Sequence, residues 1–191
     1  MSSGAAPNPA SARIRELSAS VFNYWFGYVS NFVIVGWLIS RAFEGGRLQM
    51  SVPAFVAFAV TGLAIWTLGE YAMHKFLYHA LESPLKIGHD LHHAEPHSLL
   101  GVPWWITAIA VVGLFYGLAT LFNPAVTGVL MAFAWLGYIA YCFLHHSLHH
   151  FHWRFRWFVS LRRHHLLHHA KHDVNWGVTT DLWDRVFKTK A

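Results

Sequence analysis

Apolar residues are gathered into four long runs, and charged residues are almost absent from these runs. The first run has no charge until Arg41, and the second has none until Glu70. The third and fourth runs contain no charged residue. A transmembrane helix needs roughly 20 mostly apolar residues. The pattern therefore predicts membrane spans at about 21–43, 52–72, 104–122 and 124–144.

The length and composition favour one membrane domain. The chain has 191 residues, of which 55% are hydrophobic and only 12% are charged, whereas about 25% is usual for a soluble domain. A soluble protein with four buried core helices is the alternative, but these runs leave too few polar residues for a water-facing surface. We expect a disordered or interfacial tail over 1–20, with a short helix near 13–17, and a single domain over 21–191.

The distribution of charge predicts how the spans are oriented. Short hairpins at about 44–51 and 123 would join the spans in pairs, so the tail, the long loop after the second span and the C-terminal segment share one side. All 16 histidines fall on that side, as do all Lys and Arg residues except Arg41 and Arg47. Such an excess of basic residues marks the cytoplasmic face of a membrane. We expect a bacterial inner membrane, or alternatively the endoplasmic reticulum. The apolar runs argue against a nucleic-acid partner despite the net charge of +5.

The histidines follow spacings that suit metal binding. His145 and His149 are four residues apart, and a His-x-x-His-His box occurs at 89–93 and again at 165–169. Offsets of three and four residues fall on one face of an α-helix, so each box could aim two or three imidazoles at one point. The candidate ligands are His74, His79, His89, His92, His93, His145, His149, His165, His168 and His169.

His74 and His79 do not fit this rule, because they are five residues apart. Residues with that spacing do not share a face of a regular α-helix. Either the helix is irregular at this point, or the two histidines serve different ions. A zinc site uses three or four protein ligands. Ten imidazoles are therefore too many for one ion and suit two ions with five ligands each.

Ligand type alone does not identify the metal, because neutral imidazole suits Zn, Cu, Fe and Ni. Iron is favoured, since oxidation of an unactivated C–H bond in an acyl chain needs O2 and a redox-active cofactor; zinc is possible in a purified form. The single cysteine, Cys142, excludes a cysteine-ligated cluster. A hydrolase lacks support, because no Gly-x-Ser-x-Gly pattern occurs. Glu70 lies four residues before His74 and is expected to orient that imidazole.

Other polar and aromatic residues have less specific interpretations. Tryptophans such as Trp153 and Trp157 are typical of a membrane-interface belt. Arginines such as Arg154 and Arg156 suit contacts with lipid headgroups, with docking of an acidic electron donor as a second use. The sequence leaves open the roles of His97, His146, His150, His152, His164 and His172.

Five motifs together resemble the fatty acid hydroxylase / sterol desaturase superfamily. They are EYAMHKFLYH, HDLHH, FLHHSLHH, RRHHLLHHAKH and NWGVTTDLWDRVFKT, and they extend over about 66–189. Among the branches of the superfamily, the motifs look most like those of fatty acid 2-hydroxylases. The ordered set of histidine boxes is specific, whereas any single box would be a weak signal.

The resemblance implies an all-α integral membrane fold, in which four transmembrane helices are capped by a cytosolic, histidine-rich dimetal domain. It implies the same ten ligands and oxygen-dependent hydroxylation of a lipid acyl chain, of the fatty acid or sphingolipid/ceramide type, at position 2. This chain has no room for the haem cytochrome domain that such enzymes often carry. We therefore expect a separate electron donor, of the cytochrome or ferredoxin/reductase type.

Other functions remain open from the sequence. His97 stands where the resembling branch tends to have Asp, and the loop 99–105 has one Pro where a pair is common. A sterol or carotenoid oxidase or hydroxylase of the same superfamily is therefore an alternative substrate class. A metal transporter would place ionisable residues within its spans, and the third and fourth runs have none. A non-catalytic protein held together by zinc is the remaining alternative.

Overall fold

The computed structural model describes residues 9–191. The first described helix, α1 (Pro9–Ser18), contains the predicted short helix near 13–17 and begins earlier than the sequence indicated. Residues 1–8 of the predicted tail lie outside the described residues. Bidentate hydrogen bonds of 2.6 and 2.9 Å join the Arg15 guanidinium on α1 to the Glu95 carboxylate.

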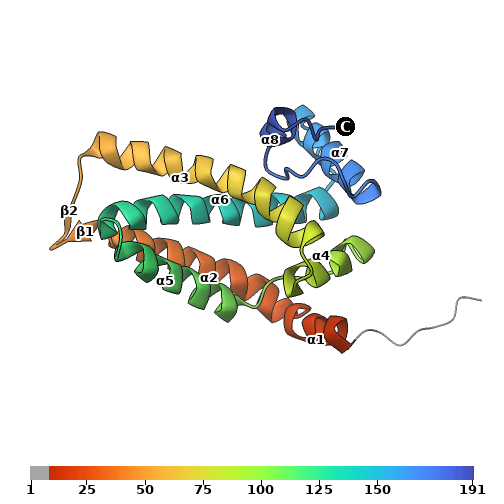
Figure 1. The fold of residues 1–191 in the computed structure, drawn as a ribbon, viewed down its shortest axis with the longest axis horizontal. Coiled ribbons are helices and arrows are strands. Elements are labelled where there is room, and N and C mark those ends of the chain that lie inside the picture. Colours follow the sequence, from red (N-terminus) through yellow and green to blue (C-terminus); the bar gives the residue numbers. More distant parts are fainter. Residues whose placement is uncertain (1–8) are drawn as a thin grey trace, which may run out of the picture.

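Four long helices correspond to the four predicted spans. They lie alongside one another as α2 (Val21–Ser40), α3 (Val52–Ala72), α5 (Trp104–Ala119) and α6 (Pro124–His150) (Figure 1). The Ser20, Ser51 and Asn123 side chains cap α2, α3 and α6 by accepting backbone N–H groups of the first turn. The fourth helix continues to His150, beyond the predicted end at 144, and therefore carries histidines on its last turns.

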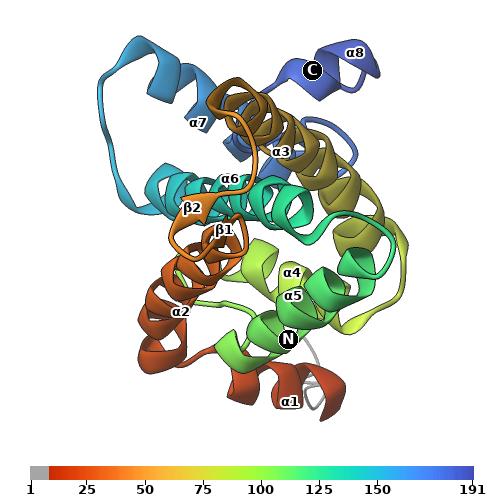
Figure 2. The same ribbon diagram turned by 90° about the vertical axis from the view of Figure 1, so that its left-hand side faces the viewer.

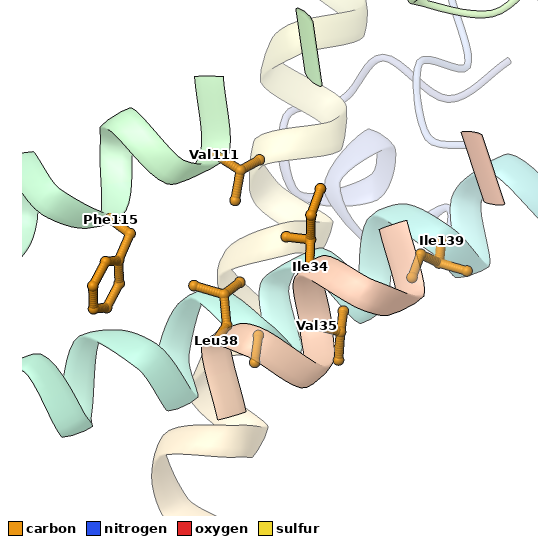
Figure 3. Close-up of a cluster of buried hydrophobic side chains, with 7 residues drawn as sticks. Ile34, Val35, Leu38, Val111, Phe115 and Ile139 are labelled. Atoms are coloured by element: carbon orange, nitrogen blue, oxygen red, sulfur yellow. The ribbon is translucent and has the colours of Figure 1, made fainter. Parts of the chain in front are cut away.

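Helix α6 packs against α2, α3 and α5. Glycine allows the close approach to α3, because a Cβ atom at Gly137 would lie 2.5 Å from the Trp66 ring. On the other side, Ile34 and Leu38 of α2 meet Val111 of α5 in a buried apolar cluster (Figure 3). Among the described residues, Val52–Ala80 and α6 are the helices that are long and apolar enough to cross a membrane, and α5 is shorter.

A tight hairpin closes one end of the helix bundle (Figure 1). Strands β1 (Phe43–Glu44) and β2 (Arg47–Leu48) pair antiparallel, with Phe43 opposite Leu48. The connecting Gly45 and Gly46 have φ angles of +56° and +78°. A two-residue turn with positive φ at both positions favours glycine, because it has no Cβ atom.

The remaining elements gather at the opposite end of the bundle (Figure 1). Figure 2 looks along the bundle from the hairpin end, with β1 and β2 in front. Helix α3 continues into the π-helix η1 (Met73–Ala80), which is followed by α4 (Pro84–Ala94). After α6 come α7 (Arg156–Ala170) and the short α8 (Leu182–Val186). The two histidine-rich parts of the chain are therefore close together in space, although α5 and most of α6 separate them in sequence.

Candidate metal centre

The π-helix resolves the unusual spacing of His74 and His79. Helix η1 covers both residues, and it ends where the Leu81 N–H donates to the Phe76 carbonyl at 2.8 Å, an i→i+5 hydrogen bond. A π-turn brings residues five apart nearly onto one face. The two imidazole rings accordingly lie 5.3 Å apart between centroids. Of the two possibilities left open by the sequence, the irregular helix is correct, and both histidines join one group.

The first histidine group is built by η1, α4 and α7. Its ligand atoms, one from each residue, all lie within 4.8 Å of one another. The Nε2 atom of His89 is 3.1 Å from that of His74 and 2.9 Å from that of His93. The members of the group are His74, His79, His89, His93 and His168.

The second histidine group is built by α4, α6 and α7, and its ligand atoms also lie within 4.8 Å of one another. The Nε2 atom of His165 is 2.8 Å from that of His149 and 3.2 Å from that of His169. The members of the group are His92, His145, His149, His165 and His169. The structure thus divides the ten predicted ligands into two groups of five, the number expected for two ions.

Each His-x-x-His-His box is divided between the groups, rather than aimed at one point. On α4, His89 and His93 belong to the first group and His92 belongs to the second. On α7, His168 belongs to the first group, whereas His165 and His169 belong to the second. Adjacent residues on a helix point about 100° apart, so neighbouring histidines can face different sites. The His93 and His169 rings stack at 4.2 Å between centroids, which brings the two groups side by side.

The nitrogen atoms of both groups fit metal ions. The Nε2 atoms of His79, His145 and His168 are buried without a hydrogen-bond partner among the described residues. The Nδ1 atom of His168 is 2.8 Å from the Val174 carbonyl oxygen. Because a carbonyl oxygen only accepts, Nδ1 carries the proton and the Nε2 lone pair is available for a metal. An unpaired buried acceptor is costly unless a ligand satisfies it.

Burial keeps the imidazoles neutral, which is the form that binds metals. It lowers the pKa of His168 to about 3, with a further decrease caused by nearby His79. It lowers the pKa of His169 to about 4, with repulsion from His172 acting in the same direction. Both side chains are therefore uncharged near pH 7, where a proton does not compete with a metal for Nε2.

Glu70 supports the centre through the segment 174–179 rather than by direct contact with an imidazole. Its carboxylate accepts the backbone N–H groups of Val178 and Thr179 at 2.6 and 2.8 Å, and the Thr179 hydroxyl at 2.5 Å. The segment in turn presents the Trp176 carbonyl to Nδ1 of His74. Glu70 therefore supports His74 through the backbone of this segment, and not by the direct contact that its spacing from His74 suggested.

Asp184 also holds this segment, a role that no sequence pattern predicted. Its buried carboxylate accepts the N–H groups of Trp176 and Gly177, each at 2.8 Å, and Nε2 of His164 at 3.0 Å. Burial alone would raise the pKa of Asp184, but these hydrogen bonds outweigh it and hold the pKa below its ordinary value. One of the unassigned histidines, His164, is therefore a partner of this carboxylate. An acidic residue in a short terminal helix is ordinarily exposed, so no local pattern identified it.

The other unassigned histidines lie around the two groups. Nδ1 of His146 is 2.9 Å from the Tyr24 hydroxyl, and its ring stacks on that of His150 at 4.2 Å. The ring of His97 is 5.7 Å from that of His150. His172 contacts the first group, with its ring 4.6 Å from that of His93. His152 is exposed, and its Nε2 atom lies 3.4 Å from Nη2 of Arg162.

An apolar cavity of about 490 Å³ leads to the second histidine group. Its walls come from α1, α2, η1, α4, α6 and the segment 96–107. His92, His145 and His149 line one part of it, whereas His89 is the member of the first group that reaches it. Pockets of this size and lining bind mostly apolar small molecules. The cavity therefore gives such a molecule access to the second histidine group.

Comparisons with known proteins identify the family of the chain. The fatty acid hydroxylase family model matches residues 59–189. A dihydroceramide fatty acyl 2-hydroxylase of Arabidopsis thaliana is 31% identical over 165 residues, covering 82% of this chain and 68% of that protein. A fatty acid 2-hydroxylase of Rattus norvegicus is 34% identical over 159 residues, covering 74% of this chain and 41% of that protein.

A solved structure supports the same relationship. Full-length scs7p, of which only the hydroxylase domain is visible, superposes with a TM-score of 0.73 and 26% identity, covering 93% of this chain and 69% of that chain. The resemblance inferred from the ordered histidine motifs is thus confirmed. Because the family model covers more than half of its length, the chain belongs to the fatty acid hydroxylase family.

Proposed function

We propose that the protein is a membrane monooxygenase that hydroxylates a lipid acyl chain, of the fatty acid or ceramide type, at carbon 2. The observation that carries this proposal is the apolar cavity that reaches His92, His145 and His149. The relatives named as fatty acid or fatty acyl 2-hydroxylases support the substrate class and the position of hydroxylation. An acyl chain in the cavity would have its reacting carbon near the second histidine group.

The two histidine groups would each hold one metal ion, with iron favoured and zinc possible in purified protein. The unpartnered Nε2 atoms of His79, His145 and His168 support this assignment. When bound, a pair of redox-active ions would supply the activation of O2, the co-substrate, that attack on a C–H bond requires. Zinc has no redox chemistry, so a zinc-loaded protein would be folded but inactive.

The chain itself orients the ligands and keeps water away from them. Tyr141 stacks on the His145 ring at 5.5 Å between centroids, and Tyr78 stacks on the His89 ring at 5.0 Å. These aromatic rings restrict the two imidazoles, and both tyrosines also line the apolar cavity. Exclusion of water would protect the reaction from side reactions. The carbonyl groups of Val174 and Trp176 orient two imidazoles of the first group, those of His168 and His74.

We further propose that α2, α3, α5 and α6 all span the membrane, with the histidine groups at the cytoplasmic face of a bacterial inner membrane. Support comes from apolar side chains that point outward: Val29 is 56% exposed, Val60 61% and Ile109 67%. Such exposure is unfavourable in water and natural in lipid. The exposed segment around Trp153, Arg154 and Arg156 would lie at the membrane surface. A separate cytochrome or ferredoxin/reductase would deliver electrons from the same side.

Lipid profiling tests the reaction. The full chain would be expressed with iron in a host that makes no 2-hydroxylated acyl chains, beside His168→Ala and the control His152→Ala. We expect 2-hydroxy acyl chains from the wild-type chain and from the control, and none from His168→Ala. A sterol or carotenoid product in place of the hydroxy acyl chain would contradict the proposed substrate. Turnover by His168→Ala would contradict the ligand assignment.

A further inference from the structure

The apolar cavity runs inward from the histidine groups along three helices. On α6, its lining extends from His150 back to Tyr138, a distance of about 18 Å at 1.5 Å per residue. On α2, it extends from Asn23 to Asn31, and on α5 it reaches Thr107. Helices α2 and α5 run away from the histidine groups and α6 runs toward them (Figure 1), so these three end points, Asn31, Thr107 and Tyr138, lie at the inner end of the cavity.

Beyond that end, the same helical faces are filled with packed side chains. Ile34 follows Asn31 on α2, Val111 follows Thr107 on α5, and Trp135 precedes Tyr138 on α6, each by three or four residues. Ile34 and Val111 are buried members of the apolar cluster in Figure 3, and Trp135 packs against that cluster. The cavity is therefore closed at its inner end.

A hydrogen bond fixes the residues at this closed end. The Asn31 side chain is 7% exposed, and its Oδ1 atom accepts the indole N–H of Trp135 at 3.0 Å. The Trp135 ring lies 4.6 Å from the Tyr138 ring, which lines the cavity. A buried amide in apolar surroundings is costly unless it is hydrogen-bonded. The bond thus holds the large indole in one position behind the cavity lining.

Gly27 leaves the passage toward this end open. It lines the cavity four residues before Asn31, on the same face of α2. A Cβ atom at Gly27 would meet no atom within 4 Å. Unlike Gly137, then, Gly27 is not required by close helix packing, and glycine in the interior of a helix is less stable than alanine by about 1 kcal/mol. A larger side chain at this position has room to extend into the cavity.

We propose that Asn31 and Trp135 form a floor that sets the longest acyl chain the cavity accepts, and that Gly27 keeps the path to this floor clear. The inference rests on the proposed function, in which the acyl chain occupies the cavity with its reacting carbon at the second histidine group. It adds a length limit for the chain and names the residues that impose it.

Opposite substitutions test the floor. Trp135→Ala removes the indole of the floor, and Trp135→Leu is a smaller change in case the first variant does not fold. Gly27→Leu inserts a side chain one helical turn nearer to the histidines. Trp37→Ala is the matched control, because Trp37 also packs against the apolar cluster but its ring contacts Phe115 and Tyr116 instead of the cavity residue Tyr138. Each full-length chain would be purified in detergent and its thermal unfolding followed with saturated fatty acids of increasing length.

We expect stabilisation of the wild-type chain to increase with fatty acid length up to a limit. The Trp135 variants should raise this limit, and Gly27→Leu should lower it by the few carbons that one helical turn of about 5.4 Å accommodates. Trp37→Ala should leave the limit unchanged even if it lowers the melting temperature. The lengths of the hydroxylated chains made in the host should change in the same directions.

The two proposals fail in different ways. An unchanged length limit in both the Trp135 and Gly27 variants, with hydroxylated chains still formed, overturns the floor and leaves the reaction standing. Length limits that change as expected without any hydroxylated chain overturn the reaction and support the floor. A change in the same direction in Trp37→Ala and in Trp135→Ala would show that general loosening of the bundle, rather than the floor, determines the length.

Discussion

The Nδ1 atom of His74 lies 2.5 Å from the carbonyl oxygen of Trp176, a residue 102 positions later in the chain. This contact ties η1 to the segment before α8. The imidazole is thereby oriented by a peptide group whose own position depends on Glu70 and Asp184. The geometry of the first histidine group therefore depends on residues that contact no ligand atom of that group.

Replacement of Glu70 tests this dependence. Glu70→Ala removes the acceptor for the N–H groups of Val178 and Thr179, whereas Glu70→Gln retains one oxygen in the same position. Loss of groups that orient metal ligands typically reduces metal affinity by about 10- to 100-fold. We expect a reduction of that size for Glu70→Ala and a smaller one for Glu70→Gln, measured by competition with a chelator. The exposed Glu82→Ala is the control; an equal effect there would contradict the proposed role.

Asp184 should matter more for stability than its neighbour Asp181. Asp184→Asn directs an amide NH2 group at N–H donors that now point to a carboxylate. Leaving buried donors unpaired costs about 1–3 kcal/mol, so we expect a lower melting temperature and reduced metal content. Asp181 is more exposed and pairs with Arg185 and Lys190, and such surface pairs contribute about 0–1 kcal/mol. Equal losses in Asp181→Asn and Asp184→Asn would contradict the assignment.

The close contact of α3 with α6 predicts a large effect at one glycine. Gly137→Ala would place a Cβ atom 2.5 Å from the Trp66 ring, and overpacking of this kind costs about 1–3 kcal/mol. At Gly113, a Cβ atom meets nothing within 4 Å, so Gly113→Ala should be neutral or stabilising. Thermal unfolding of the two variants in the same detergent measures the difference.

Metal-free protein should lose stability in acid. The pKa of His169 falls from its ordinary value of 6.5 to about 4 on folding. Between these values the unfolded chain binds more protons than the folded chain, so stability decreases as the pH is lowered from about 6.5 to about 4. Melting temperatures of the metal-free chain across this range should show the decrease. Bound metal should displace it to lower pH, because the ligands then resist protonation.

Chelation separates structural from chemical roles of the ions. Removal of metal should lower the melting temperature, because the histidines lose the bound ions that join η1, α4, α6 and α7. Zinc and iron should both restore the melting temperature, but only iron should restore 2-hydroxylation. Restoration of turnover by zinc alone would contradict the proposed oxygen chemistry.

Local patterns in the sequence predicted the helices well. The starts of α3, α5 and α6 agree with the predicted starts at 52, 104 and 124, because a proline or a capping residue precedes or begins each apolar run. The helix ends were less predictable. The apolar run of α6 stops near 144, but the helix continues to His150 because the histidines that follow pack against α4 and α7.

The arrangement of the site was only partly predictable, because it depends on contacts distant in sequence. Spacing identified the ten histidines that the structure divides into two groups, since offsets of three and four are local. It did not reveal the π-helix at His74, nor that each box serves both groups. The contacts of Glu70 with Thr179 and of Asp184 with Trp176 join separate elements, and no periodic pattern signals such pairs.

Helices α4 and α7 each contribute neighbouring histidines to different groups, His92 beside His93 and His168 beside His169. In the proposed dimetal centre, an ion in one group fixes the same two backbones that carry ligands of the other. The first ion would therefore reduce the conformational entropy that remains to be lost when the second binds. Occupancy should consequently be cooperative, and at limiting metal the population should divide into empty and doubly loaded molecules, with few that hold a single ion.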